Sequence, residues 1–371
     1  MVKNKLDKSK RGDVALLIAV TFLAFIGAVF IYSASRYSAK ATYGDSLYFV
    51  KKQIIGILLG IVAMLFTANF SYNRLKKFNI GLSAVTIILL CLVFVPNIGV
   101  ENYGAKRWLS LGAFTLQPSE IAKFSLILFG ATYFSKYPQN SRKLLGILPV
   151  LCYGLIVCLL IILEPNMSIT VCVALLMIAI LFCAGIKIKY LIFIGLPAVV
   201  LGVLLILAEP YRLNRLGAFL NPWSNPKGEG YQLLQSLYAL GSGGWFGVGL
   251  FNSRQKYAFL PFAESDFILS VIGEEVGFTG LILFFGLLGF IIFRGLKIAH
   301  SSKDLFGFLL SIGITLIFGI QVIINALVVT GSIPPTGLPL PLVSGGNTSI
   351  IIFMAEMGVL FNVSKCSSLT F

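Results

Sequence analysis

The chain has 371 residues, of which 57% belong to the set AVILMFWYC and only 12% are charged. Soluble domains carry about 25% charged residues, because polar groups must cover their surface. This composition excludes a soluble enzyme, a disordered chain and a disulfide scaffold. About ten helices of roughly 20 residues would account for the apolar excess. The sequence therefore predicts a multi-spanning membrane protein.

Ten apolar runs follow one another along the chain. The first, from Val14 to about Ala34, is longer than a signal-peptide core and lacks a convincing cleavage site, so we interpret it as a retained span. The others lie near 54–70, 80–98, 119–135, 144–163, 167–185, 190–208, 267–293, 305–330 and 346–363. We predict an all-α integral membrane protein of about ten transmembrane helices, in one polytopic domain covering residues 1–371.

An even number of spans places both termini on the same side of the membrane. With the N-terminus inside, the inner segments contain 17 Lys and Arg, five of them in a basic tail at residues 1–13. The short outer segments contain six: Arg36, Lys40, Lys51, Lys52, Lys106 and Arg107. Five more lie in a long outer loop, which the positive-inside rule tends to discount. The comparison favours an N-in/C-in topology.

The membrane also explains the net charge of +15. Basic residues gather in cytoplasmic loops and are attracted by anionic lipid head groups. We therefore expect membrane lipid, and no nucleic acid, as the partner of this charge.

A large extracytoplasmic loop at 209–265 separates the seventh and eighth spans. Its cations Arg212, Arg215 and Lys256, with seven glycines between Gly228 and Gly249, could hold an anion such as a phosphate, or simply touch lipid head groups. A short apolar stripe within the loop predicts a helix that lies either on the membrane surface or over the bundle. Its members are Tyr231, Leu233, Leu234, Leu237 and Leu240.

Two charged residues enter the membrane at the start of the fourth span. Glu120 and Lys123 are three residues apart and so share one helix face. Intramembrane charges are functional candidates by default, although a structural ion pair is the alternative. Lys106 and Arg107 precede them in the same outer loop.

Asp266 lies at the outer mouth of the eighth span, where it could serve as a general base or as a simple helix N-cap. Glu274 is about 12 Å further along the same helix, too far for a close carboxylate pair. Four acids lie within spans, against the single base Lys123: Glu120, Glu274, Glu275 and Glu356. Some of them must be protonated, hydrogen-bonded or exposed to a wet cavity.

Taken together, these motifs resemble the SEDS family (shape, elongation, division and sporulation), the FtsW/SpoVE/RodA group. The similarity covers nearly the whole chain. Its motifs are Gly104-Ala105-Lys106-Arg107-Trp108, Gln117-Pro118-Ser119-Glu120-Ile121-Ala122-Lys123, Asn221-Pro222-Trp223, Gly230-Tyr231-Gln232, Gly247-Val248-Gly249, Ser253-Arg254-Gln255-Lys256, Asp266-Phe267-Ile268, Gly273-Glu274-Glu275-Val276-Gly277 and Gly337-Leu338-Pro339-Leu340-Pro341. The Asn-Pro-Trp and Ser-Arg-Gln-Lys forms resemble the FtsW/SpoVE branch more than RodA.

The resemblance implies a peptidoglycan glycosyltransferase that polymerises lipid II at the outer face of the bacterial cytoplasmic membrane, usually with a class B penicillin-binding protein. The family's essential aspartate corresponds to Asp266, and its charged pair to Glu120 and Lys123. For substrate binding the expected residues are Lys106, Arg107, Glu120, Lys123, Arg212, Arg215, Lys256 and Ser344. The diphosphate leaving group needs cations, either these side chains or a divalent ion such as Mg or Mn; no cofactor is otherwise expected.

Two motifs depart from the family pattern. The usual glutamate after Leu260-Pro261 is replaced by Phe262, and the usual Ser-Tyr-Gly-Gly-Ser-Ser is replaced by the run from Ser344 to Ser349. Both lie near the expected site and leave its acid in place. The sequence leaves two other functions open, a transporter of a lipid-linked precursor and a non-catalytic scaffold for a transpeptidase.

Overall fold

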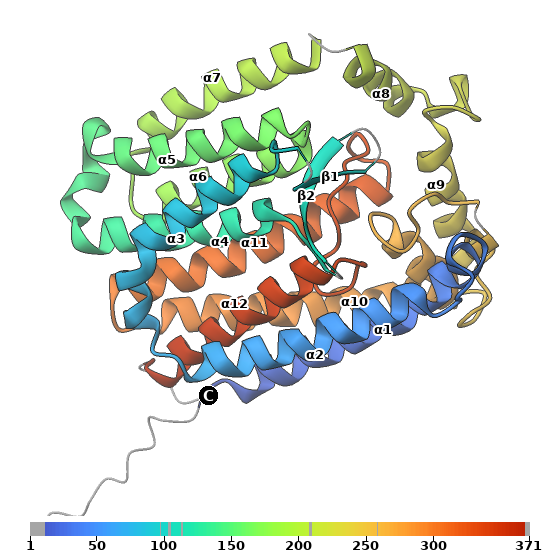
Figure 1. Cartoon of the computed structure of the whole chain (residues 1–371), viewed down its shortest axis with the longest axis horizontal. Helices are drawn as coiled ribbons and strands as arrows, with labels where there is room; N and C mark the ends of the chain where they lie inside the picture. Colours follow the sequence, from blue (N-terminus) through green and yellow to red (C-terminus); the bar gives the residue numbers. More distant parts are fainter. Residues whose placement is uncertain are drawn as a thin grey trace, which may run out of the picture.

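The structure is a computed structural model that describes residues 12–96, 98–102, 105–112, 114–207, 210–257 and 259–367. Long helices lie side by side in one bundle, with a small sheet at one end (Figure 1). The α-helices are α1 (Val14–Tyr43), α2 (Tyr48–Asn69), α3 (Tyr72–Leu92), α4 (Pro118–Lys136), α5 (Leu144–Leu163), α6 (Met167–Cys183), α7 (Ile188–Leu207), α8 (Pro210–Leu220), α9 (Tyr231–Gly243), α10 (Ile268–His300), α11 (Leu305–Val329) and α12 (Asn347–Lys365). The strands are β1 (Gly99–Asn102), β2 (Ala105–Leu111) and β3 (Phe114–Leu116).

Ten of these helices, all except α8 and α9, correspond to the ten predicted spans. Seven of the described helices are long and apolar enough to cross a membrane, and two shorter apolar helices cover Met167–Cys183 and Ile188–Leu204. Helix α4 carries the charges of Glu120 and Lys123 near its start. The predicted all-α membrane fold is confirmed.

The first three helices differ in their ends from the predicted apolar runs. Helix α1 continues past Ala34 to Tyr43, α2 begins at Tyr48, and α3 covers 72–92 instead of 80–98. Lys and Arg are good helix formers, so a helix does not stop where its apolar run ends. Hydropathy therefore locates the part of a helix that lies in lipid rather than its two ends.

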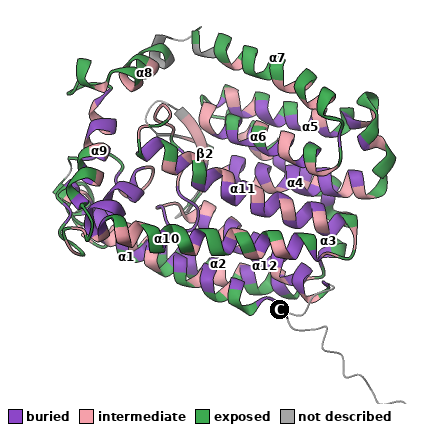
Figure 2. Cartoon of the chain, turned by 180° about the vertical axis from the view of Figure 1, so that it is seen from behind, coloured by how far each residue is buried: buried purple, intermediate pink, exposed green. Residues whose placement is uncertain are grey.

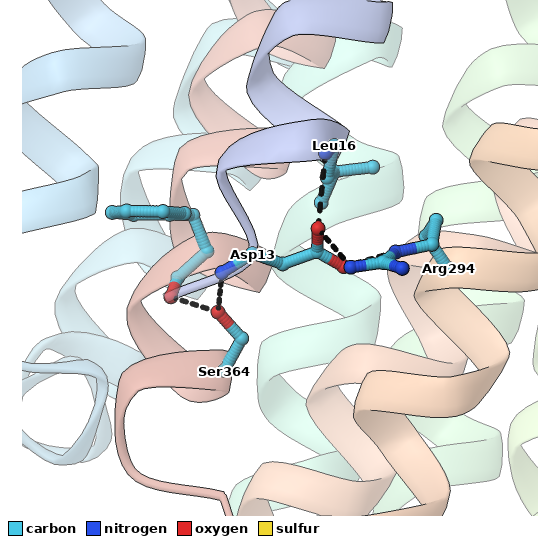
Figure 3. Close-up of polar contacts among 5 residues, drawn as sticks. Asp13, Leu16, Arg294 and Ser364 are labelled. Carbon is cyan, nitrogen blue, oxygen red and sulfur yellow. Dashed lines mark hydrogen bonds and ion pairs between the residues drawn. The ribbon is translucent and has the colours of Figure 1, made fainter. Parts of the chain in front are cut away.

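The start of α1 and the end of α12 meet at one end of the bundle, around Asp13 (Figure 3). This buried carboxylate accepts a hydrogen bond from Leu16 N at 3.1 Å and caps α1. Arg294 of α10 donates to it through Nε at 2.6 Å, and the Asp13 N–H donates to the Ser364 hydroxyl of α12 at 2.8 Å. The start of α1 and the end of α12 are thus on the same side, as the even number of spans requires.

Helix α10 is interrupted at Gly277, whose φ is +67°. The loop after α9 supplies the missing partners, so that no backbone group at the break is stranded in an apolar setting. The replacing hydrogen bonds are Val248 N to Glu274 O (3.0 Å), Gly249 N to Glu275 O (3.1 Å), Phe278 N to Gly244 O (2.9 Å) and Thr279 N to Trp245 O (3.0 Å).

Because the loop after α9 packs into the break in α10, we expect Gly247→Ala to destabilise the protein strongly. Gly247 has a φ of +79°, and a Cβ there would lie 2.1 Å from the Glu275 carbonyl oxygen. We expect the free energy of unfolding of the detergent-purified protein to fall by about 2–4 kcal/mol, as measured by chemical denaturation. The control is Gly286→Ala in α10, where a Cβ meets nothing within 4 Å. Equal stability of the two variants would show that the loop does not pack into the break.

The two acids beside the break are hydrogen-bonded. Glu274 accepts from the Ser253 hydroxyl and from Arg254 N at 3.0 Å. Glu275 accepts from the hydroxyl of Ser33 on α1 and from Ser253 N at 3.3 Å. Of the alternatives that the sequence leaves for buried acids, hydrogen bonding is therefore confirmed for these two.

The outer segments contain more structure than hydropathy indicates. The strands form an antiparallel sheet in the order β1-β2-β3, which the sequence pattern does not predict. Helix α9 packs over the bundle, with Leu233 and Leu234 buried and the Ser236 hydroxyl 2.7 Å from that of Ser270. The alternative of a helix lying on the membrane surface is wrong. Helix α7, in contrast, is mostly exposed and lies at the edge of the bundle (Figure 2).

Candidate active site

Asp266 lies just before the first turn of α10. The N-cap of that helix is Phe267, without a side-chain capping hydrogen bond, so the N-cap alternative for Asp266 is wrong. The carboxylate is half-buried and faces the backbone of Gly337, where a Cβ would lie 3.3 Å from Asp266 Oδ2. Any larger residue at position 337 would crowd the acid.

The backbone around Asp266 is held from two sides. Asn325 of α11 donates through Nδ2 to the carbonyl oxygens of Asp266 and Leu338, each at 2.9 Å. The Ser344 hydroxyl donates to the Ser265 carbonyl at 2.5 Å, and Gly345 N donates to the Glu264 carbonyl at 2.9 Å. The segment between α11 and α12 thus fixes the position of the acid.

The charges around Asp266 come from three separate parts of the chain. Burial, and after it the negative charge of Glu264, raises the pKa of Asp266, whereas the positive charges of Arg107 and Arg215 oppose the increase; the resulting pKa is about 7. A carboxylate with a pKa near the working pH suits a general base, because it both accepts and releases a proton readily.

Arg107 is positioned by the turn that follows α5. Its Nε donates to the Glu164 carbonyl at 3.4 Å and its Nη2 to the Pro165 carbonyl. The Glu164 side chain is 1% exposed; burial raises its pKa to about 8 and the charge of Arg107 opposes this. The carbonyls at the end of α5 carry partial negative charge, which favours a guanidinium there.

Other predicted site cations differ in their location. Arg215 lies on α8 with an exposed side chain, whereas the side chain of Arg212 lies outside the described residues. Lys106 precedes Arg107 in β2, so its side chain leaves the opposite face of the strand. Lys256 bonds the Phe251 carbonyl and lies 5.8 Å from the ring of Tyr37 on α1.

Glu120 and Lys123 form an ion pair of 2.6 Å inside the bundle. Lys123 is 1% exposed and Glu120 is fully buried, and the Lys123 ammonium also lies 5.3 Å from the ring centroid of Phe353 on α12. Buried Glu356 follows one turn later in α12. This burial favours the structural alternative for the pair over direct contact with a substrate.

Asp266 and Glu264 are the two acids of the site. Among the described residues, no group of three or more His, Cys, Asp and Glu side chains could hold a metal ion. Magnesium is commonly held by one or two carboxylates together with substrate phosphates, so Asp266 and Glu264 are the residues that would hold such an ion beside a diphosphate.

Asn325 and Glu164 are not predicted as site residues from the sequence, and Gly337 is named there only as part of a family motif. Asn325 is a polar residue in an apolar helix, a signal that was available, because such residues usually bond to something. Glu164 and Gly337 lie in short outer turns, and only the folded chain brings them to Arg107 and Asp266.

Comparison with known proteins gives consistent matches along the whole chain. The family model FTSW_RODA_SPOVE, described as a cell cycle protein, matches residues 14–369. The chain is 40% identical to a probable peptidoglycan glycosyltransferase FtsW of Trichlorobacter lovleyi, over 95% of this chain and 93% of the relative. It is 38% identical to the stage V sporulation protein E of Bacillus subtilis, over 97% and 99%.

Two solved structures have the same fold. One is a chain described under the structural coordination of polymerization and crosslinking by a peptidoglycan synthase complex. Its TM-score is 0.79, and it is 28% identical to this chain, with 95% of this chain and 97% of that chain covered. The other is the rod shape determining protein RodA of Thermus thermophilus, with a TM-score of 0.69 and 26% identity over 96% and 98%.

Proposed function

Because the chain belongs to the FtsW/RodA/SpoVE family of multi-pass cytoplasmic membrane proteins, we propose that it is a peptidoglycan glycosyltransferase that polymerises lipid II at the outer face of the membrane. The observation that carries the proposal is that charged side chains from distant parts of the chain act on Asp266. A half-buried acid with a pKa of about 7 lies within the field of Arg107 and Arg215, which come from distant parts of the chain.

In this mechanism Asp266 acts as the general base. The acceptor sugar hydroxyl is a poor nucleophile until its proton is removed, and one positioned carboxylate is sufficient for that task. Asn325 and Ser344 contribute as positioning residues, since they bind the backbone on which Asp266 is carried.

The cations act on the leaving group. The donor sugar departs from a lipid diphosphate, whose growing negative charge needs stabilisation rather than a proton. Arg107, clamped by the turn after α5, and Arg215 on α8 are the cations whose charges reach Asp266. Arg215 is exposed, so we assign it to the approaching diphosphate and Arg107 to the site interior.

The attack is a direct displacement with inversion at the sugar. Glu264 is the other acid of the site. Its negative charge raises the pKa of Asp266, so we assign it to adjusting that pKa rather than to a second catalytic role. Trapping of a covalent glycosyl-enzyme on Asp266 would contradict this mechanism.

We expect the pH–rate profile of polymerisation to fall on the acid side only (its acid limb). Asp266 acts as a base only when deprotonated, so we expect the rate to fall about tenfold per pH unit below pH ~6 and to level off above pH ~8. Glu264→Gln removes the negative charge that raises the pKa of Asp266 and should move the limb to lower pH. An acid limb that is unchanged in Glu264→Gln would argue against Asp266 as the titrating group.

A transpeptidase partner of the class B penicillin-binding type follows from the same proposal. It is supported by the fold shared with a chain of a peptidoglycan synthase complex. Purified protein in liposomes with lipid II, with and without such a partner, tests the function. Glycan chains support a polymerase; lipid II movement across the bilayer without polymer supports a transporter instead.

A further inference from the structure

Two polar contacts join α1 to α10. At one end, Asp13 binds Arg294 of α10; at the other, Ser33 donates to Glu275 of the same helix. The contacts are 20 residues apart on α1, or about 30 Å along that helix. The last ten residues of α1, after Ser33, follow the second contact and lead into the outer α1–α2 connection.

This end of α1 borders a cavity of about 350 Å³. We call it the α1 outer cavity. It is lined by Arg36, Tyr37, Lys40, Gly44, Asp45 and Ser46. Ligand pockets have volumes of roughly 300–1,000 Å³, so this one would admit a small polar head group. Arg36 lies about one turn beyond Ser33 on α1.

The charges of the α1 outer cavity are unbalanced. Its one acid, Asp45, is already bound to Lys51 at 2.7 Å and to Leu47 N at 2.9 Å. Among the described residues, no carboxylate forms an ion pair with Arg36 or Lys40. These two cations are four residues apart on one helix face, a spacing at which like charges repel. An anion between them would remove that repulsion.

The side chains are arranged to receive such an anion. The Arg36 guanidinium lies over the rings of Tyr32 and Tyr37, at 5.7 and 6.0 Å from their centroids. The planar guanidinium has paired N–H donors whose geometry matches the oxygens of a phosphate. Lys40 adds a point charge one turn further out.

The distribution of cations in the sequence points the same way. Basic residues are normally kept out of short outer segments. Here those segments contain six, of which four lie around the α1–α2 connection: Arg36, Lys40, Lys51 and Lys52. The charge of Lys40 suits the end of a helix, but that role does not explain Arg36 or the cavity.

We propose that the α1 outer cavity binds the phosphate group of a lipid in the outer leaflet, through Arg36 and Lys40. A phosphate is favoured over a carboxylate because phosphates are the anionic groups of membrane lipids and the cavity lies on an outer connection between two predicted spans. The source is either an anionic phospholipid or a polyprenyl diphosphate. The proposal does not depend on the glycosyltransferase function, since Arg36 and Lys40 have no part in the proposed reaction.

The test measures lipid binding to the full-length, detergent-purified protein by native mass spectrometry. The probes are dioctanoyl phosphatidylglycerol, farnesyl diphosphate and, as a lipid without phosphate, dioctanoylglycerol. A basic residue near a charged lipid contributes about fivefold in affinity. We expect the double variant Arg36→Gln/Lys40→Gln to bind a phosphate probe roughly 25-fold more weakly and dioctanoylglycerol unchanged. Whichever phosphate probe loses affinity identifies the source.

The matched control is Arg74→Gln/Lys77→Gln, which removes two exposed cations one turn apart at the start of α3. Its phosphate affinity should stay within about twofold of wild type. The proposal is overturned if the cavity variant keeps its affinity, if the control loses as much, or if neither phosphate probe outcompetes dioctanoylglycerol. Should the double variant not fold, the single change Lys40→Gln must give about a fivefold loss.

Discussion

Replacement of Asp266 by asparagine is expected to reduce lipid II polymerisation by about 10²–10⁴-fold, the usual contribution of a general base. The amide has the same shape as the acid but cannot take a proton from the acceptor hydroxyl. The hydrogen bonds at this position go to the backbone of Asp266, so the fold should not change. The measurement is glycan chain length and yield from lipid II, with purified protein and its transpeptidase partner in liposomes.

The control for this variant is Glu229→Gln. It makes the same acid-to-amide change on an exposed residue of the same outer loop and should leave the rate within about twofold of wild type. If Asp266→Asn retains wild-type polymerisation, the proposed base is wrong. A scaffold without catalytic function is indicated instead if neither the wild type nor Asp266→Asn forms glycan and cells carrying the variant grow normally.

Replacement of Lys123 by methionine is expected to lower the free energy of unfolding by about 3–5 kcal/mol. The ammonium is 1% exposed and 2.6 Å from Glu120, with Glu356 one turn from Phe353 on the facing helix. Its removal leaves buried acids without a counter-charge. Chemical denaturation of the purified protein in detergent measures the loss.

Two further variants distinguish a broken pair from a general defect in α4. Glu120→Gln/Lys123→Met removes both charges and should regain much of the stability lost in the single variant. Lys136→Met removes an exposed lysine from the last turn of the same helix and should cost less than about 0.5 kcal/mol. Equal losses in Lys123→Met and Lys136→Met would mean that the ion pair adds nothing.

Several site residues were predictable because each has a local signal. Asp266 is an acid beside an apolar run, and Glu120 with Lys123 is a charged pair at helical spacing within one. Arg107 is a cation in a short outer segment, where cations are uncommon. Ser344 and Lys256 have weaker signals: the first contacts the Asp266 loop and the second lies with Tyr37 at the end of α1.

The sequence by itself determined the membrane class, the ten spans, the same-side termini and the candidate acid, because each depends on composition or on residues close together in the chain. Tertiary structure alone decided which cations act on Asp266 and which acids are hydrogen-bonded. It also decided that a cavity lies beside the end of α1. Those properties arise from contacts between segments up to hundreds of residues apart. Hydropathy is read along the chain and contains no information about such contacts.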